Sequence, residues 1–384
     1  MAGRPEEVLA WLSSREADME ALLERLVRTE SPTVDATAQR RALALLAAEL
    51  EKAGYLTRSI SGSGVNRHLY ARPRRPARGA PRQLVIGHID TVWPVGTIGE
   101  MVPRVDDGRF YGPGAYDMKG GLVQLAFALR ALRAVGATPS VTPVVLVNSD
   151  EETGSLGSSS IVRKLARRAC RVFVLEPAAG PQGDLKTGRK GVGRFRLRVH
   201  GRSAHAGSSP EEGISAILEL SQQVQQLFEL NDRERGITVN VGTVDGGHLP
   251  NVIAAEASAL IDVRAPTAEA AYEVERAIRN LRPVNRFVVL TVDGGFERPP
   301  MPAAERNRNL YRRAEALGSQ IELELGEATM VGGGSDANFT SALAATLDGL
   351  GSVGEGAHAA HEHVVVSSLP QRAALLALLL LEPE

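Results

Sequence analysis

Two adjacent glutamates, Glu151 and Glu152, follow an apolar run and have side chains well suited to chemistry. One carboxylate could bind a metal ion while its neighbour takes a proton from the water that the metal has made acidic. Adjacent residues at the end of a strand point in opposite directions, so the two roles do not compete for one position. Taken alone, an Asp-Glu-Glu run is more often a solvated turn, and the pair needs support from elsewhere in the chain.

Other apolar runs also end at residue types that bind metals. One is followed directly by His88, and Asp90 lies two positions further, on the same face of an extended segment. A carboxylate placed there can orient a metal-binding imidazole by accepting a hydrogen bond from its second ring nitrogen. Another run ends at Glu176, and Asp117 stands in a glycine-rich loop before an expected helix. These elements are expected to deliver their side chains to one edge of a sheet, where open α/β sheets bind ligands.

The order of the expected elements predicts two domains. Helical and extended patterns alternate from residue 1 to about 190, which indicates an α/β domain with a mixed, largely parallel sheet flanked by helices. Residues 191–300 follow the order β-α-β-β-α-β, which is typical of a ferredoxin-like α+β domain. The chain then returns to the first domain. We therefore expect a catalytic domain of residues 1–190 and 301–384 with an inserted domain of residues 191–300.

Composition narrows the class of protein. A chain of 384 residues is long for one domain, and its net charge of -1 gives no basic field of the kind that nucleic-acid binders have. Residues 1–11 contain acidic side chains and no apolar core, so no signal peptide is expected. The apolar stretch 373–381 is too short to cross a bilayer. The simplest expectation is a cytoplasmic protein with no membrane or nucleic-acid partner.

Seven short motifs follow one another along the chain, at residues 87–92, 114–120, 150–155, 175–177, 201–207, 332–336 and 354–362. Each is weak alone, but in this order they closely resemble peptidase family M20, the two-zinc group of aminoacylases, acetylornithine deacetylases and glutamate carboxypeptidases. Residues 203–207 and 332–336 are most similar to the glutamate carboxypeptidase branch. In that family the inserted domain is a lid that also forms the dimer interface, so the resemblance implies a homodimer.

The resemblance implies that Asp117 bridges two zinc ions. His88 and Glu176 would complete one site, and Glu152 and His358 would complete the other. Three protein ligands on each ion leave a position open for substrate, as a catalytic site requires. Cobalt or manganese could replace zinc, because nitrogen and oxygen ligands of this kind also bind those metals.

His358, the last of the expected metal ligands, has two other histidines close to it in the sequence. His358 stands four residues before Glu362, which matches the spacing of the family. His361 and His363 are close in sequence and are the alternatives. We expect His358 to be the ligand and the other two to lie around the site.

Further roles also follow from the resemblance. Glu151 would be the general base and then the acid that protonates the leaving amine, and Asp90 would orient His88. His205 of the inserted domain would reach the metal centre of the partner subunit and help to hold the oxyanion.

Four residues are expected to bind the substrate. Asn251 and Arg264 match residues that grip a free carboxylate, and the planar fork of arginine suits that task. Gly333 and Ser335 lie in a glycine-rich loop that lines the substrate pocket in the family. Without the resemblance, a salt bridge at the end of a strand would be the first interpretation of Arg264.

The expected function is zinc-dependent hydrolysis of the amide bond to a C-terminal amino acid with a free carboxylate, preferably glutamate, in a small peptide or N-acyl compound. The nearest alternative is an N-acyl amino acid deacylase of the acetylornithine or aminoacylase type. An alternative of another class is a metal- or peptide-binding protein without catalysis. The presence of Glu151 and of all five ligands argues against that third reading.

Overall fold

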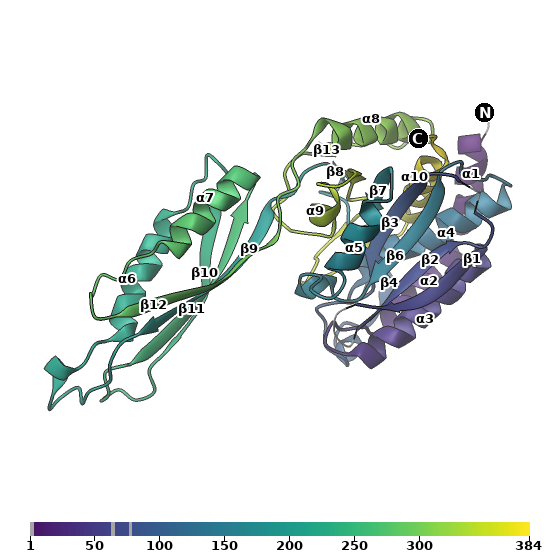
Figure 1. Ribbon diagram of the computed structural model, residues 1–384. Helices are drawn as coiled ribbons and strands as arrows, with labels where there is room; N and C mark the ends of the chain where they lie inside the picture. Colours follow the sequence, from purple (N-terminus) through teal and green to yellow (C-terminus); the bar gives the residue numbers. More distant parts are fainter. Residues whose placement is uncertain (1–3, 63–65, 77–78) are drawn as a thin grey trace. The chain divides into compact units, whose positions relative to one another are not determined.

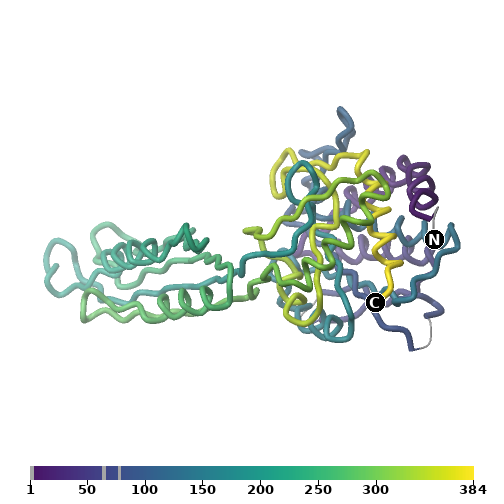
Figure 2. Tube along the Cα trace, turned by 90° about the horizontal axis from the view of Figure 1, so that it is seen from above, coloured from purple at the N-terminus to yellow at the C-terminus, as the bar shows by residue number. Residues whose placement is uncertain are grey.

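A computed structural model describes residues 4–62, 66–76 and 79–384, so residues 1–3 of the N-terminal segment lie outside the described part. The chain forms two compact units (Figure 1), the first of Met1–Thr187, Ala303–Thr329 and Ser335–Glu384, and the second of Gly188–Pro302 and Met330–Gly334. Residues 330–334 belong to the second unit because backbone hydrogen bonds join Val331 to Gly188 and Lys190. Figure 2 shows by its colours that the second unit comes from the middle of the chain and that both ends lie in the first.

The first unit is built on a six-stranded sheet. Strands β3, β6, β7 and β14 run parallel, while β1 and β2 are antiparallel to their neighbours. This confirms the expected mixed, largely parallel sheet. The strand order is β1 (Tyr55–Ser61), β2 (Arg67–Pro73), β6 (Thr142–Asn148), β3 (Arg82–His88), β7 (Arg171–Val174) and β14 (Ala345–Leu347).

Helices flank this sheet, with α2, α3 and α4 on one side and α5 on the other (Figure 1). Helix α4 is largely apolar and mostly buried, and it packs against α10 in the main core. Asp35 caps α3 by accepting hydrogen bonds from the backbone N–H groups of Thr37 and Ala38. The helices are α1 (Arg4–Ser13), α2 (Glu16–Arg28), α3 (Ala36–Lys52), α4 (Gly120–Ala134), α5 (Ser159–Ala166), α8 (Glu305–Ser319), α9 (Ala337–Thr340) and α10 (Ser368–Leu381).

Shorter elements complete the first unit. A small sheet has the order β15 (Gly354–Glu355), β16 (His363–Val365), β5 (Arg109–Tyr111) and β4 (Arg104–Asp106), and a second pairs β8 (Leu185–Lys186) with β13 (Glu327–Ala328). The turns that carry functional side chains are η2 (Ala115–Lys119) and η3 (Glu151–Thr153), and η1 (Thr97–Gly99) follows β3. None of the helices in the described residues combines the length and apolar character needed to cross a bilayer.

The second unit has the predicted ferredoxin-like element order. Its four antiparallel strands lie in the order β10 (Thr238–Gly246), β11 (Glu256–Ala265), β9 (Gly191–His200) and β12 (Val289–Arg298). Helices α6 (Ala216–Glu229) and α7 (Ala268–Arg279) pack on one face, and η4 (Pro210–Glu212) precedes α6. Along β9, Phe195, Leu197 and Val199 are buried in a second, separate core. The alternation of apolar and polar residues therefore decides which face of the sheet the helices cover.

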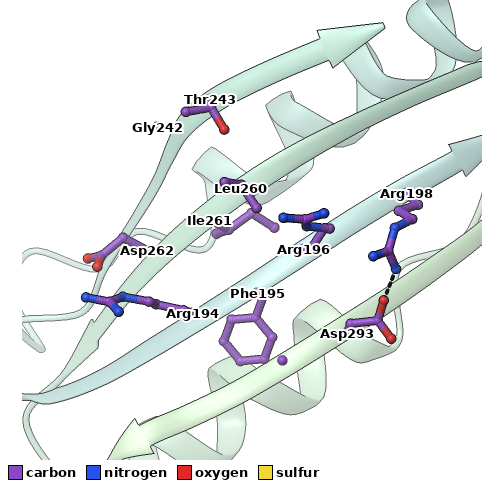
Figure 3. Close-up of a pocket in the computed structure, with 11 residues that line it drawn as sticks. Arg194, Phe195, Arg196, Arg198, Gly242, Thr243, Leu260, Ile261, Asp262 and Asp293 are labelled. Carbon is purple, nitrogen blue, oxygen red and sulfur yellow. Dashed lines mark hydrogen bonds and ion pairs between the residues drawn. The ribbon is translucent and has the colours of Figure 1, made fainter. Parts of the chain in front are cut away.

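The other face of this sheet carries charged side chains and a hollow of about 400 Å³ (Figure 3). Arg194, Arg196 and Arg198 of β9 lie along it, and Figure 3 shows Arg198 paired with Asp293 of the neighbouring strand. Arg194 makes a similar ion pair with Glu297 at 3.4 Å. Cross-strand pairs of opposite charge stabilise a sheet, so this row of arginines has a structural role.

Candidate active site

The parallel strands bring the expected metal ligands to one edge of the first sheet. His88 ends β3, and the neighbouring strands β6 and β7 are followed directly by the Glu151–Glu152 turn and by Glu176. The carboxyl ends of parallel strands meet at one edge, which explains this convergence. The turn η2 supplies Asp117, and the loop between β15 and β16 supplies His358.

The ligand atoms form two groups that share Asp117. Nε2 of His88 lies 3.2 Å from Oδ1 of Asp117 and 3.7 Å from Oε1 of Glu176. Nε2 of His358 lies 3.5 Å from Oδ2 of Asp117 and 3.2 Å from Oε2 of Glu152. Two ligands of one tetrahedral zinc ion, each about 2.0–2.1 Å from the metal, lie about 3.3 Å apart. Each carboxylate oxygen of Asp117 therefore faces a different group at the spacing of metal ligands.

The donor set fits metal cations. His88, Glu151 and Glu176 offer donor atoms within 4.8 Å of one another, and so do His88, Asp117 and Glu152. Carboxylates gathered in a largely buried site repel one another unless a cation balances them. In addition, Oε1 of Glu152 is buried and has no hydrogen-bond donor among the described residues, as expected of an oxygen that serves a metal.

The histidines of this site bind protons strongly when metal is absent. Burial opposes the charged form of His88, but its hydrogen bonds to Asp117 and Asp90 raise its pKa well above the usual value. Hydrogen bonds to Asp117 and Glu152 raise the pKa of His358 to about 10. Both imidazoles are therefore protonated at neutral pH in the metal-free protein.

Metal binding at pH 8 is expected to release protons from these imidazoles, because a metal binds only neutral histidine and both pKa values are raised. Both pKa values are raised, so protons compete with metal below them and metal affinity rises with pH from 6 to 9. Calorimetric titration of metal-free protein with Zn²⁺, in buffers of different ionisation enthalpy, measures this release. Binding with no proton release at pH 8 would contradict the protonation state assigned to His88 and His358.

Asp90, which is expected to orient His88, contacts its ring through both the backbone and the side chain. Nδ1 of His88 lies 2.9 Å from the backbone carbonyl oxygen of Asp90 and 3.5 Å from its carboxylate. The carboxylate instead accepts hydrogen bonds from the hydroxyl of Thr33 at 2.9 Å and from the backbone N–H of Glu152 at 3.1 Å. The carbonyl is the closer partner of the imidazole, while the carboxylate lies beside the ring with Oδ1 and holds the turn of the two glutamates with Oδ2.

Glu151 has the surroundings that a general base needs. It is buried in η3, and one of its carboxylate oxygens lies within 4.8 Å of a ring nitrogen of His88 and of a carboxylate oxygen of Glu176. Its neighbour Glu152 faces His358 instead. The two carboxylates thus serve different positions, as their adjacency in the sequence predicts.

A buried polar network supports this turn, and its members received no role from the sequence. Asp150 accepts hydrogen bonds from the backbone N–H and the hydroxyl of Ser158, at 3.0 and 2.6 Å. Asp336 accepts from Asn148 at 2.6 Å and from the hydroxyl of Ser155 at 2.5 Å. The sequence does place Asp150 and Asp336 inside two of the seven motifs, and this position could have pointed to their role.

Residues of the glycine-rich loop 332–336 form hydrogen bonds within the protein itself. Ser335 is fully buried and its hydroxyl donates to Asp348 at 2.8 Å, so its expected contact with substrate has no support in this structure. Gly333 is exposed, and its carbonyl oxygen accepts a hydrogen bond from Arg189 at 2.9 Å. Gly333 belongs to the second unit and Ser335 to the first.

His205 is exposed and presents a defined tautomer. Its Nδ1 accepts hydrogen bonds from the backbone N–H groups of Gly207 and Ser208, both at 3.1 Å. A neutral imidazole that accepts at Nδ1 carries its proton on Nε2, so the ring offers an N–H donor. The carbonyl oxygen of Asn251 accepts from the backbone of Ala206 at 3.0 Å, which places Asn251 beside the His205 segment.

Asn251 and Arg264 do not come together within one chain. Asn251 lies five residues before β11, and Arg264 stands eight residues after the first residue of that strand. The strand between them spans about 26 Å at 3.3 Å per residue. Nε and Nη2 of Arg264 are bound by the carboxylate of Asp262, both at 2.8 Å, and Nη1 lies 3.5 Å from the carbonyl oxygen of Gly332. Arg264 therefore forms a salt bridge with Asp262 at the end of β11, as the interpretation without the family resemblance predicts.

Contacts of the neighbouring histidines favour His358 as the ligand. His363 is buried, its ring lies against Tyr111, and its Nδ1 is 3.0 Å from the carbonyl oxygen of His361. His358 adopts a positive φ of 62° that carries its ring to Asp117.

This fold and this cluster of His, Asp and Glu define a metal-dependent hydrolase whose α/β domain carries an inserted α+β domain. Comparison with known proteins agrees, because the model of peptidase family M20/M25/M40 matches residues 84–382. The chain belongs to this family, which confirms the expected resemblance, and it is a hydrolase that acts on amide bonds.

Relatives extend the match over almost the whole chain. Carboxypeptidase G2 of Pseudomonas sp. (strain RS-16) is 31% identical over 369 residues, which cover 94% of this chain and 88% of that protein. Succinyl-diaminopimelate desuccinylase of Delftia acidovorans (strain DSM 14801 / SPH-1) is 27% identical over 374 residues, 91% of this chain and 93% of that protein.

Solved structures share the fold. Aminopeptidase PepT of Bacillus cereus ATCC 10987 superposes with a TM-score of 0.77 at 21% identity and covers 95% of this chain and 98% of that one. The YXEP protein of Bacillus subtilis, described as a dinuclear metal binding peptidase of family M20, has a TM-score of 0.69 at 14% identity and covers 96% of this chain and 98% of that one.

Proposed function

We propose that this protein is a two-zinc carboxypeptidase that releases a C-terminal amino acid with a free α-carboxylate, of the glutamate type, from small peptides or N-acyl compounds. The observation that carries the proposal is the pair of ligand groups that share Asp117, with Glu151 beside them. The similarity to carboxypeptidase G2 supports the substrate class.

The residues divide the chemistry among them. His88, Asp117 and Glu176 would hold one ion, and Asp117, Glu152 and His358 would hold the other. When bound, the ions supply Lewis acidity to the scissile carbonyl and to the attacking water. Glu151 takes the proton of that water and then gives it to the leaving amine, whose departure as a free anion would be unfavourable.

Arg264 is the proposed partner of the substrate carboxylate. Asp262 binds one edge of its guanidinium group through Nε and Nη2 and so fixes the direction of the group. The edge formed by Nη1 and the second hydrogen of Nη2 can still meet a carboxylate with two parallel hydrogen bonds. Gly333, exposed in the adjacent loop, would offer its backbone N–H to the same ligand.

We also propose a homodimer in which the lid residues serve the partner's site. Asn251 and Arg264 can bind one carboxylate only if they come from different subunits, because β11 separates them in each chain. Strand β10 is an edge of the lid sheet, and exposed apolar side chains near it include Val244, Leu218 and Leu249, at 61%, 63% and 55% exposure. An unpaired edge with apolar neighbours suits an isologous contact between two copies.

A deacylase that acts on N-acyl amino acids is the second candidate. The observation in its favour is the end-to-end similarity to succinyl-diaminopimelate desuccinylase. Both candidates use the same metal ligands and base, so they differ only in the groups on either side of the scissile bond.

A substrate panel tests this proposal. Zinc-loaded protein is incubated with N-acyl amino acids, dipeptides and folate-like glutamate conjugates, and released amino acids are measured by mass spectrometry. We expect release of glutamate or aspartate from varied acyl groups, and no release from matched substrates whose α-carboxylate is amidated, because Arg264 then lacks its partner. Release of only basic or apolar amino acids would favour the deacylase, and no release at all would refute both candidates.

A further inference from the structure

Glu362 is a buried carboxylate that accepts hydrogen bonds from four donors. It is 1% exposed. Its Oε2 accepts from the indole N–H of Trp93 at 2.8 Å and from the backbone N–H of Gly114 at 2.9 Å. Its Oε1 accepts from the backbone N–H groups of Tyr116 and Asp117, both at 3.0 Å. All three backbone donors belong to the loop that carries Asp117, the residue placed between the two ligand groups.

Only a carboxylate can satisfy this arrangement. Two oxygens that each accept two hydrogen bonds use the full acceptor capacity of an ionised carboxyl group, whereas an amide would present two N–H donors in place of one oxygen. The backbone of this turn is irregular, since Gly114 has a φ of 71° and the turn is not helical at Asp117, and Glu362 accepts from three of its N–H groups. A buried N–H without a partner is strongly unfavourable.

The loop that carries Glu362 also carries His358. The backbone N–H of Glu362 donates to Ala359 at 2.9 Å, and that of Ala359 donates to Gly356 at 2.8 Å, so the segment between β15 and β16 is a compact turn. The backbone carbonyl of Glu362 accepts from Gly112 at 3.2 Å, which adds a main-chain link to the loop of Asp117.

The two metal positions depend on Glu362 to different extents. His88 and Glu176 follow strands β3 and β7, whose spacing is fixed by the hydrogen bonds of the sheet. Asp117 and His358 lie on loops outside this sheet, with 3.5 Å between Oδ2 and Nε2. Contacts through Glu362 join those two loops directly.

We infer that Glu362 is a positioning residue that fixes the separation of Asp117 from His358 and thereby the metal site formed by Asp117, Glu152 and His358. The inference rests on the proposed metal ligands. Glu362 itself does not bind metal or substrate, because backbone and indole N–H groups surround both of its oxygens. Second-layer partners of metal ligands typically change metal affinity by about 10- to 100-fold when they are lost.

The test uses Glu362→Gln in the full-length chain, with Co²⁺ as the probe. Metal-free protein is titrated in competition with a chelator, and the absorption spectrum of bound Co²⁺ is recorded at each step. We expect two binding events, of which the one at Asp117, Glu152 and His358 weakens by about 10- to 100-fold with a changed spectrum. The other event also uses Asp117 but keeps His88 and Glu176 on the sheet, so it should weaken by a smaller factor. Glu355→Gln, at an exposed glutamate that ends the preceding strand β15, is the matched control and should change neither event.

Trp93→Phe gives a second, milder variant, because it removes one of the four donors and leaves the carboxylate in place. It should weaken the same event by a smaller factor, and it keeps the inference testable if Glu362→Gln does not fold, which thermal melting of the metal-free protein would reveal. Equal weakening of both events, or no weakening of either, would overturn the inference. The experiment measures metal affinity and not hydrolysis. A negative substrate panel would therefore refute the proposed function and leave the inference about Glu362 standing.

Discussion

Replacing Glu151 by glutamine is expected to lower kcat by about 10²- to 10⁴-fold while both metal ions remain bound. The amide keeps the size of the side chain but cannot take a proton from water or return it to the leaving amine. Metal content by mass spectrometry and kcat on the best substrate of the panel are the two measurements. The exposed Glu100→Gln is the matched control and should leave both unchanged.

Two other outcomes of the Glu151→Gln experiment are informative. Retained turnover would refute the role of general base. Loss of one metal ion would make Glu151 a ligand, a role that its closeness to His88 and Glu176 also permits. Unchanged metal content with no turnover would separate this protein from a binding protein that never had catalysis.

His205→Ala is expected to lower kcat by about 10²- to 10³-fold, the usual effect of losing one donor to an oxyanion. The exposed ring offers its Nε2–H because Nδ1 accepts from Gly207 and Ser208. His200→Ala, an exposed histidine at the end of β9, is the control. An unchanged kcat for His205→Ala would contradict the proposed donor.

Mixing the two inactive proteins distinguishes action within a subunit from action across the dimer. A hybrid dimer of His205→Ala and Glu151→Gln chains has one site with an intact Glu151 and the partner's intact His205. Random exchange of equal amounts makes half of all dimers hybrid, so about a quarter of the normal activity should return. No recovery after proven subunit exchange would place His205 in the site of its own chain.

The fold was largely predictable from the sequence because its signals are local. Alternation of apolar and polar residues along β9 marks a half-buried strand, and the order of such segments predicts the ferredoxin-like unit. Apolar runs that end at His88 and Glu176 predict strands with ligands at their carboxyl ends. Each of these signals lies within about ten residues, so tertiary contacts are not needed to read them.

Contacts between distant segments were not predictable in this way. The pairing of Asp336 with Asn148 joins residues 188 positions apart, and that of Glu362 with Trp93 joins residues 269 apart. The sequence likewise shows Asn251 and Arg264 only 13 positions apart, and it does not show that a strand holds them at opposite ends of a sheet. Such distances depend on how the elements pack and not on any local pattern.

The inserted lid also sets the order in which the proposed metal ligands are made. His88, Asp117, Glu152 and Glu176 precede the second unit, and His358 follows it. At about 5–20 residues per second, the ribosome adds the 182 residues from Glu176 to His358 in roughly 10–40 s. During that time the second unit, which has its own core, can fold while four of the five proposed metal ligands are already made. The loop of Asp117 gains its partner Glu362, and the proposed site its fifth ligand His358, only near the end of synthesis.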